Sequence, residues 1–245
     1  MNRRDAETQS GARRTFSSAP LRLCGENHWL LWQLADSAFP TGGFAHSGGL
    51  EAAWQHREVR GGSELVEFLR AALVQLRHNA MPFAHATFTG AREFSDVDGL
   101  CEAFLSNHIA NRASRLQGQA FLASVEKTFG TVELKAFRSA VNEQNLPGHF
   151  APVFGCVTRL LAFDSDSAAR LFVFIQLRGW ISAAVRLNIV GPMEGQQIQH
   201  QLSRDAESAA ARFGEVPLED AAQTAPLLDL WQGTQDRLYS RLFQT

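Results

Sequence analysis

Lysine and tyrosine are the residue types that this sequence uses least. Its 245 residues include two lysines, Lys127 and Lys135, against 21 arginines, and one tyrosine, Tyr239, against 18 phenylalanines. Neither lysine stands in the GxxxxGK[ST] pattern with which a P-loop holds nucleotide phosphates. The sequence therefore gives no support to nucleotide hydrolysis by this chain itself.

Cysteines and long apolar runs are also scarce. The three cysteines, Cys24, Cys101 and Cys156, are widely spaced and form no CxxC pair, which is typical of reduced thiols in a cytosolic protein. No apolar run reaches the roughly 18 residues of a membrane-spanning helix. The first residues mix arginines with Asp5 and Glu7 and lack the apolar core of a secretory signal. We therefore expect a cytoplasmic protein that does not enter a membrane.

The sequence also lacks an excess of charge of either sign. Basic residues number 23 and acidic residues 25, which gives a formal net charge of −2. Such a balance provides no general field for nucleic acid or anionic lipid, so we expect neither as a partner.

What the sequence has in abundance are helix-forming residues. It contains 34 Ala and 28 Leu against 13 Val and 5 Ile, and Ala and Leu favour helices whereas β-branched residues favour strands. Residues 1–26 are polar and without apolar period, which predicts a disordered tail. The rest predicts one compact all-α domain of about ten helices. Apolar spacing and capping residues place these helices over about 28–39, 48–57, 63–79, 82–88, 95–109, 114–125, 132–141, 150–162, 168–188, 196–213 and 227–232.

Several of these boundaries depend on particular residues. Ser63 has the character of an N-cap, as do Ser95 or Asp96 further along. Pro82 suits the first turn of a helix. The segment 168–188 is apolar on several faces, so we expect it at the centre of the bundle.

A glycine-rich stretch, TGGFAHSGG at residues 41–49, joins the first two helices. Its AHSGG part resembles the G-x-S-x-G nucleophile elbow of serine hydrolases, which would make Ser47 a nucleophile. That elbow requires a preceding strand, whereas the residues before it predict a helix. Asp164 and His200 could complete a catalytic triad, but no spacing in the sequence distinguishes them from other residues of their type. The alternative interpretation is that Ser47 caps the following helix.

The eight histidines do not form a metal-binding pattern. His78 and His85 are seven residues apart, but Pro82 interrupts them, and no HxxxH, HExxH or Cys-His pair occurs. His46 and His149 lie beside glycine and phenylalanine in breaks between helices. We expect them to be hydrogen-bonding surface or interface residues, and we expect no metal site in this chain.

Large apolar residues also fall in the expected breaks. Exposed groups of this kind would mark a partner site, and loop anchoring in the core is the equal alternative. The residues concerned are Phe39, Phe44, Phe150, Val153, Phe154, Leu242 and Phe243.

Several segments together resemble the urease accessory protein UreF family. They are QLADSAFPTGGFAHSGGLE at residues 33–51, PVFG at 152–155, SAAVRL at 182–187 followed by Gly191-Pro192, Gln196-Gln197, and LYSRLF at 238–243. They occur in order and span residue 28 to residue 245, leaving out the first residues.

The resemblance implies an all-α, non-enzymatic protein that forms homodimers and serves nickel delivery to urease. It implies a domain over residues 27–233 and a C-terminal tail, residues 234–245, that orders on a partner. The implied partners are a UreD/UreH-type scaffold protein, the GTPase UreG and the urease apoprotein. Nickel and GTP would be handled by that complex, with no cofactor bound by this chain itself.

The resemblance also selects the residues that we expect to contact a partner or a second copy. They are Phe39, Pro40, Gly42, Gly43, Phe44, His46, Ser47, Gly49, Leu50, Glu51, Phe154, Arg186, Tyr239, Ser240, Arg241, Leu242 and Phe243.

Two hypotheses divide these residues. Tyr239, Arg241 and Phe243 would engage the scaffold complex, and residues 39–51 would face the GTPase or a second copy. In a sharper version Arg241 acts as an arginine finger, which would raise GTP hydrolysis about a thousandfold or more. A serine hydrolase built on Ser47 and a helical adaptor unrelated to urease remain as alternatives.

Overall fold

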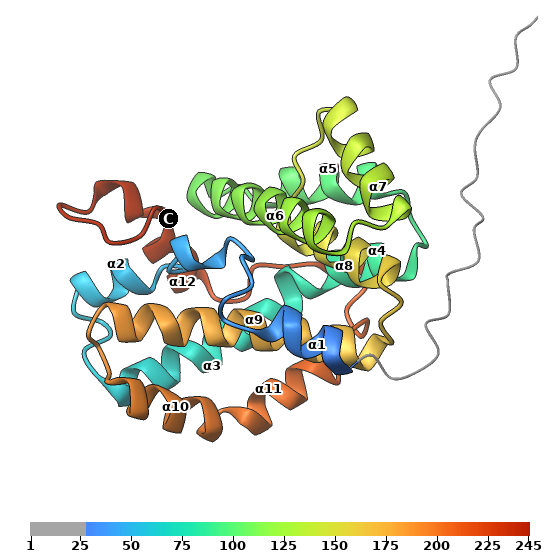
Figure 1. Ribbon diagram of the computed structural model, residues 1–245. Coiled ribbons are helices and arrows are strands. Elements are labelled where there is room, and N and C mark those ends of the chain that lie inside the picture. Colours follow the sequence, from blue (N-terminus) through green and yellow to red (C-terminus); the bar gives the residue numbers. More distant parts are fainter. Residues whose placement is uncertain (1–27) are drawn as a thin grey trace, which may run out of the picture.

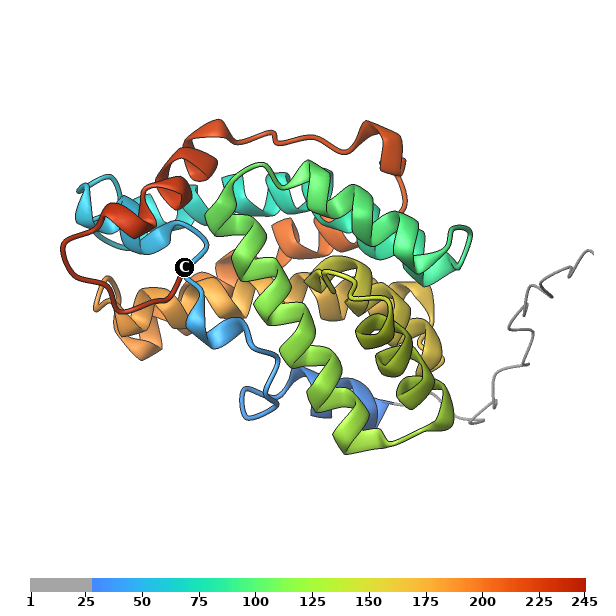
Figure 2. The ribbon, with the colours of Figure 1, turned by 90° about the horizontal axis from the view of Figure 1, so that it is seen from above.

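The computed structural model describes residues 28–245, so the tail predicted for residues 1–26 and Cys24 lie outside the described part. Within it, α-helices and short 3₁₀ helices are the only regular elements (Figures 1 and 2). The all-α prediction is confirmed. The α-helices are α1 (His28–Ala35), α2 (Leu50–Gln55), α3 (Gly62–Asn79), α4 (Met81–Thr89), α5 (Phe94–Phe104), α6 (His108–Phe129), α7 (Val132–Glu143), α8 (Phe150–Leu160), α9 (Ser165–Arg186), α10 (Pro192–Gln201), α11 (Ser203–Ala210) and α12 (Pro226–Gly233).

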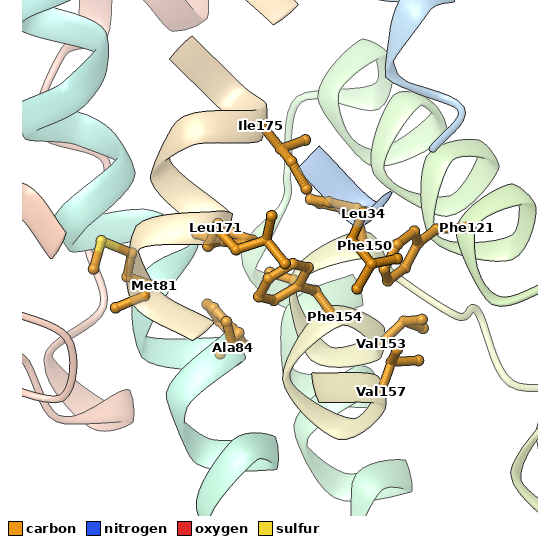
Figure 3. Close-up of a cluster of buried hydrophobic side chains, with 14 of the residues drawn as sticks. Leu34, Met81, Ala84, Phe121, Phe150, Val153, Phe154, Val157, Leu171 and Ile175 are labelled. Atoms are coloured by element: carbon orange, nitrogen blue, oxygen red, sulfur yellow. The ribbon is translucent and has the colours of Figure 1, made fainter. Parts of the chain in front are cut away.

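The larger core cluster surrounds α8, which packs closely against α4 and α6 (Figure 3). Glycine permits both contacts. A Cβ on Gly155 would lie 1.9 Å from the Ala84 carbonyl oxygen of α4, and a Cβ on Gly118 would lie 2.1 Å from the Gly148 carbonyl oxygen. Interlocking phenylalanine rings then fill the space between α6, α8 and α9, and they are Phe121, Phe150, Phe154 and Phe172.

A second core cluster lies between α2, α3, α10 and the other half of α9. Leu50 and Leu69 belong to it, together with Phe243 from the C-terminal tail. The central position expected for residues 168–188 is confirmed, because α9 contributes side chains to both clusters. By length and composition α9 could cross a membrane, but its packing against α1, α3, α10 and α11 is that of a core helix.

Some helix boundaries differ from the prediction. Ser63 lies inside the first turn of α3, after an N-cap at Gly61. Helix α5 begins at Phe94, ahead of both expected caps. Helix α6 begins at His108, because the Asn107 side chain accepts hydrogen bonds from the backbone N–H groups of its first turn.

The segment expected as one helix over 196–213 is two helices, α10 and α11, which meet at Leu202. Leu202 is fully buried in the second core cluster. The chain bends there so that α10 and α11 can each follow α9 (Figure 1).

For Phe150, Val153 and Phe154, anchoring in the core is the alternative that holds, and the expectation that Phe154 contacts a partner is corrected. Phe150, Val153 and Phe154 lie in the first turns of α8 and belong to the core, and Phe154 is 0% exposed. Packing against α4 and α6 removes them from solvent, so Phe154 stabilises the fold and offers no surface to a partner. His149 is likewise buried, with its Nε2 2.8 Å from a Glu102 carboxylate oxygen.

Candidate interaction site

The tail, residues 234–245, returns to the glycine-rich segment near the other end of the described chain (Figure 2). The Ser47 backbone N–H donates to the Thr245 carbonyl oxygen over 2.8 Å, and the Gln244 N–H donates to the Ala45 carbonyl oxygen over 2.9 Å. His46 Nδ1 is also hydrogen-bonded to the Thr245 hydroxyl. The two segments that the sequence marked separately therefore form one site, which we call the clasp (residues 36–51 and 234–245).

Glu51, in the first turn of α2, holds the tail from inside. Its carboxylate is 2% exposed. It accepts hydrogen bonds from the backbone N–H groups of Leu242 (2.6 Å) and Phe243 (3.1 Å) and from Nε2 of Gln235 (2.6 Å). A buried carboxylate is tolerable only when such donors satisfy it. Glu51 is therefore an internal anchor of the clasp.

Helix α9 fixes both ends of the loop that leads into α2. Arg178 donates to the Ala35 carbonyl oxygen over 2.6 Å, and Arg186 donates to the Phe44 carbonyl oxygen over 2.5 Å. The Arg186 guanidinium also lies 3.7 Å from the ring centre of Phe44 and 4.2 Å from that of Phe243. This cation–π arrangement joins loop, helix and tail through one side chain.

A second ionic contact ties the tail to the start of α6. Asp236 accepts a two-pronged pair of bonds from Arg112, at 2.9 and 3.1 Å, and a 2.7 Å bond from Arg241. His108 Nε2 lies 3.6 Å away. The hydrogen bond from Arg112, followed by the charges around it, holds the pKa of the Asp236 carboxyl below its ordinary value. Asp236 is thus ionised and shared by several cationic groups.

Glycines allow the loop to approach its neighbours. Gly48 and Gly49 have φ values of 62° and 90°, the left-handed region that other residues rarely adopt. A Cβ on Gly48 would lie 2.6 Å from the Trp180 indole nitrogen of α9. The glycines thus serve chain geometry and close packing.

His46 is half-buried within the clasp. Burial, and next the positive charge of Arg112, lower its pKa to about 4. The imidazole is therefore neutral at physiological pH, and one ring nitrogen faces the Thr245 hydroxyl. This is a structural role in joining loop and tail.

The expected contact residues divide by exposure. Phe44 is 70% and Leu242 52% exposed, and Tyr239 is fully exposed. Pro40, Ser240 and Arg241 are also exposed, and Gly42, Gly43, His46 and Arg186 are half-buried. Inside the clasp and unavailable to a partner in this structure are Phe39, Ser47, Gly49, Leu50, Glu51 and Phe243.

Ser47 has neither of the two roles considered for it. Its hydroxyl is buried and has no hydrogen-bond partner among the described residues, so no base activates it there. Asp164 caps α9 through the Ser167 N–H, and His200 lies on α10. Nor does Ser47 cap α2, because Gly49 occupies the N-cap position.

Several residues in the clasp or in contact with it gave no signal in the sequence. Arg112, Gln235, Asp236 and Thr245 were not selected, although each makes a contact that joins the tail to the body. Asp236 lies 124 residues from Arg112, and only the folded chain reveals such a pair.

A cavity of about 370 Å³ adjoins the clasp. Its polar lining includes Gln117, Gln176 and Gln232, and no carboxylate lines it. Across residues 28–245, no three His, Cys, Asp or Glu side chains gather as metal ligands would. His78 and His85 lie on different helices, α3 and α4.

The fold and the clasp define a class: an all-α protein with a surface that combines exposed aromatic, aliphatic and arginine side chains, a composition typical of protein–protein interfaces. Comparison with known proteins gives the family. The UreF family model matches residues 59–203, more than half of the chain. The chain therefore belongs to the UreF family of urease accessory proteins.

Individual relatives cover most of the chain. Urease accessory protein F of Oryza sativa subsp. indica is 39% identical over 221 residues, which are 89% of this chain and 85% of the relative. Urease accessory protein F of Arabidopsis thaliana is 39% identical over 219 residues, 88% and 91% of the two chains. A UreF-like urease accessory protein of Schizosaccharomyces pombe is 29% identical over 225 residues, which are 86% of this chain and 94% of the relative.

Proposed function

We propose that this protein is a non-catalytic adaptor in the assembly that inserts nickel into apo-urease. It bridges a UreD/UreH-type scaffold protein and a UreG-type GTPase, and it regulates the GTP-dependent step. Family membership supports the urease part of this proposal. The observation that carries the adaptor role is the clasp, which exposes Phe44, Tyr239 and Leu242 together with the Arg241 side chain that Asp236 holds.

The clasp bears on how two partners could be coupled. We assign the tail to the scaffold protein and the loop, residues 39–51, to the GTPase or to a second copy of this chain. Since Glu51 and Arg186 connect loop and tail, a partner that moves the tail changes what the loop presents. This connection is a physical route by which scaffold binding regulates GTPase recruitment.

Nickel and GTP belong to the partners in this proposal. No carboxylate lines the clasp cavity, and the groups there that suit divalent nickel are one imidazole, His46, and one thiol, Cys101, whose pKa burial raises. Two such groups are too few for a nickel site, and the chain lacks a Walker lysine. The arginine-finger version has less support, because Arg241 is already hydrogen-bonded to Asp236. Gating through the clasp is the version that we favour, in a cytoplasmic homodimer.

The decisive experiment substitutes exposed tail residues, which leaves the internal anchors intact. The double variant Tyr239→Ala with Leu242→Ala should lose co-purification with the scaffold protein and nickel-dependent urease activation. The control is Val132→Ala, a strongly exposed apolar residue on α7. Unimpaired co-purification and activation by the double variant would refute the proposed function.

A further inference from the structure

The tail, residues 234–245, and the charged side chains that contact it carry a net positive charge, unlike the chain as a whole. Four guanidinium groups, Arg112, Arg186, Arg237 and Arg241, lie on or beside the tail, and we call them the arginine face. The carboxylates in contact with the tail are Asp236 and Glu51. The complete chain, in contrast, has a net charge of −2.

Both carboxylates are already engaged. Glu51 is buried on three N–H donors of the tail, and Asp236 is shared by Arg112 and Arg241. Arg237 is exposed, and Arg186 and Arg237 have no ion pair within residues 28–245. Each guanidinium carries five N–H donors, so most donors of the arginine face have no acceptor among residues 28–245.

Asp236 also fixes the geometry of the array. Its Oδ1 atom accepts hydrogen bonds from both Arg112 and Arg241, which holds the two guanidinium groups next to each other. An arginine held in place loses little rotamer freedom when it binds a planar acceptor, and its fork matches a carboxylate bidentately. Exposed Tyr239 and Leu242 flank the array with apolar surface.

We propose that the arginine face binds an acidic segment of a protein partner, whose Asp or Glu side chains pair with Arg237 and Arg241 while an apolar side chain packs on Tyr239 and Leu242. This inference rests on the proposed function and adds the chemistry of the partner. A nucleic acid would need a longer basic surface than one short array that has a carboxylate at its centre. Free phosphate would leave the apolar flank without a role.

The test uses the purified full chain with the purified scaffold protein and GTPase. Arg237→Glu reverses an exposed charge that makes no ion pair in the described part of the chain, so the fold should be retained. At about 0.1 M salt we expect it to weaken binding to one of these partners by at least about tenfold. Arg237→Lys, which keeps the charge, should retain most of the affinity. The control is Arg204→Glu, exposed and without an ion pair on α11, which should bind as the wild type does.

Salt concentration decides whether the effect is electrostatic. Because charges are screened within about 3 Å at about 1 M salt, the gap between wild type and Arg237→Glu should close there. Equal binding by Arg237→Glu and Arg204→Glu, or a gap that is independent of salt, would overturn the inference. Competition by millimolar inorganic phosphate or by single-stranded DNA as strong as that by poly-L-glutamate would also overturn it, as would Arg237→Glu acting only on self-association. Failure of the proposed function is distinguishable, because the wild type would then bind neither partner at any salt concentration.

Discussion

Residue type alone does not predict the roles of Glu51 and Arg186 in holding the clasp. Glu51 is an acidic residue in the first turn of a helix, a position usually explained by the helix dipole. Here its carboxylate faces inward and binds the tail backbone. Arg186, an ordinary cation near a helix C-terminus, is stacked between two phenylalanine rings of distant segments.

Removing the Glu51 carboxylate should release the tail. In Glu51→Ala the N–H groups of Leu242 and Phe243 and the Gln235 amide lose their acceptor, which costs about 1–3 kcal/mol for each donor left buried. Opening the tail to water avoids that cost. We therefore expect tryptic cleavage after Arg237 and Arg241 to accelerate, as followed by mass spectrometry, with a smaller loss of global stability.

Glu58→Gln is the control for this prediction, since Glu58 is exposed on the turn after α2. Cleavage of the tail at wild-type rates in Glu51→Ala would show that other contacts suffice to hold it.

Among the elements, α4 and α8 show how closely two helices can approach when one carries a glycine. In Gly155→Ala the added methyl group would overlap the Ala84 carbonyl oxygen, 1.9 Å away, and the Thr87 hydroxyl, 2.3 Å away. Overpacking of this kind typically costs about 1–3 kcal/mol, and backbone overlap puts this site at or above that range. We expect a lowered denaturant midpoint or an insoluble product.

The chain supplies a matched comparison in Gly99 on α5, where an added Cβ meets nothing within 4 Å. Gly99→Ala should raise stability by about 0.5–1 kcal/mol, because alanine loses less conformational entropy in a helix. If both substitutions shift the urea midpoint equally, steric contact between α4 and α8 is not what constrains residue 155.

The individual helices also show which features of the fold the sequence could predict and which it could not. Leu65, Leu69, Leu73 and Leu76 follow the helical period on one face of α3, and that helix was found where the pattern placed it. The predicted helix boundaries were wrong where the capping side chains were misassigned, as at Asn107. Phe154 was assigned to a surface because PVFG has the composition of a break, whereas Pro152 and Gly155 both suit the start and tight packing of α8.

For the site, residue types could be predicted but their arrangement could not. The loop and the tail were both selected, yet as surfaces for different partners. His46 and Thr245 are 199 residues apart, and no periodicity or spacing in the sequence connects positions so distant. Their meeting depends on how α9, α2 and α12 pack.

For the whole molecule, buried histidines predict a loss of stability in acid. Burial is the main cause that lowers the pKa of His46, to about 4, and it also lowers the pKa of His85 and His149. Below pH 6.5 these histidines bind protons in the unfolded chain but remain neutral in the native chain. Their contribution to stability is therefore complete above pH 6.5 and is lost as the pH decreases. For His46 this loss runs from pH 6.5 down to about 4, at about 1.4 kcal/mol for each pH unit.

Urea unfolding at pH 7.5 and pH 5.5 measures this effect. The difference in unfolding free energy between the two pH values should be smaller in His46→Gln than in the wild type by about 1 kcal/mol. His200→Gln, a change on the exposed surface of α10, should keep the wild-type difference. Identical differences in all three proteins would contradict the buried, neutral state of His46.

The hydrogen bonds between residues 46–47 and residue 245 have a consequence for synthesis. The ribosome synthesises the loop early, but the tail segment that pairs with it follows only after almost two hundred further residues. Until then Glu51 and Arg186 lack the groups that they hold in the finished protein. A nascent chain that stops before residue 234 thus lacks the donors of Glu51, so the loop gains its hydrogen bonds to the tail only late in synthesis.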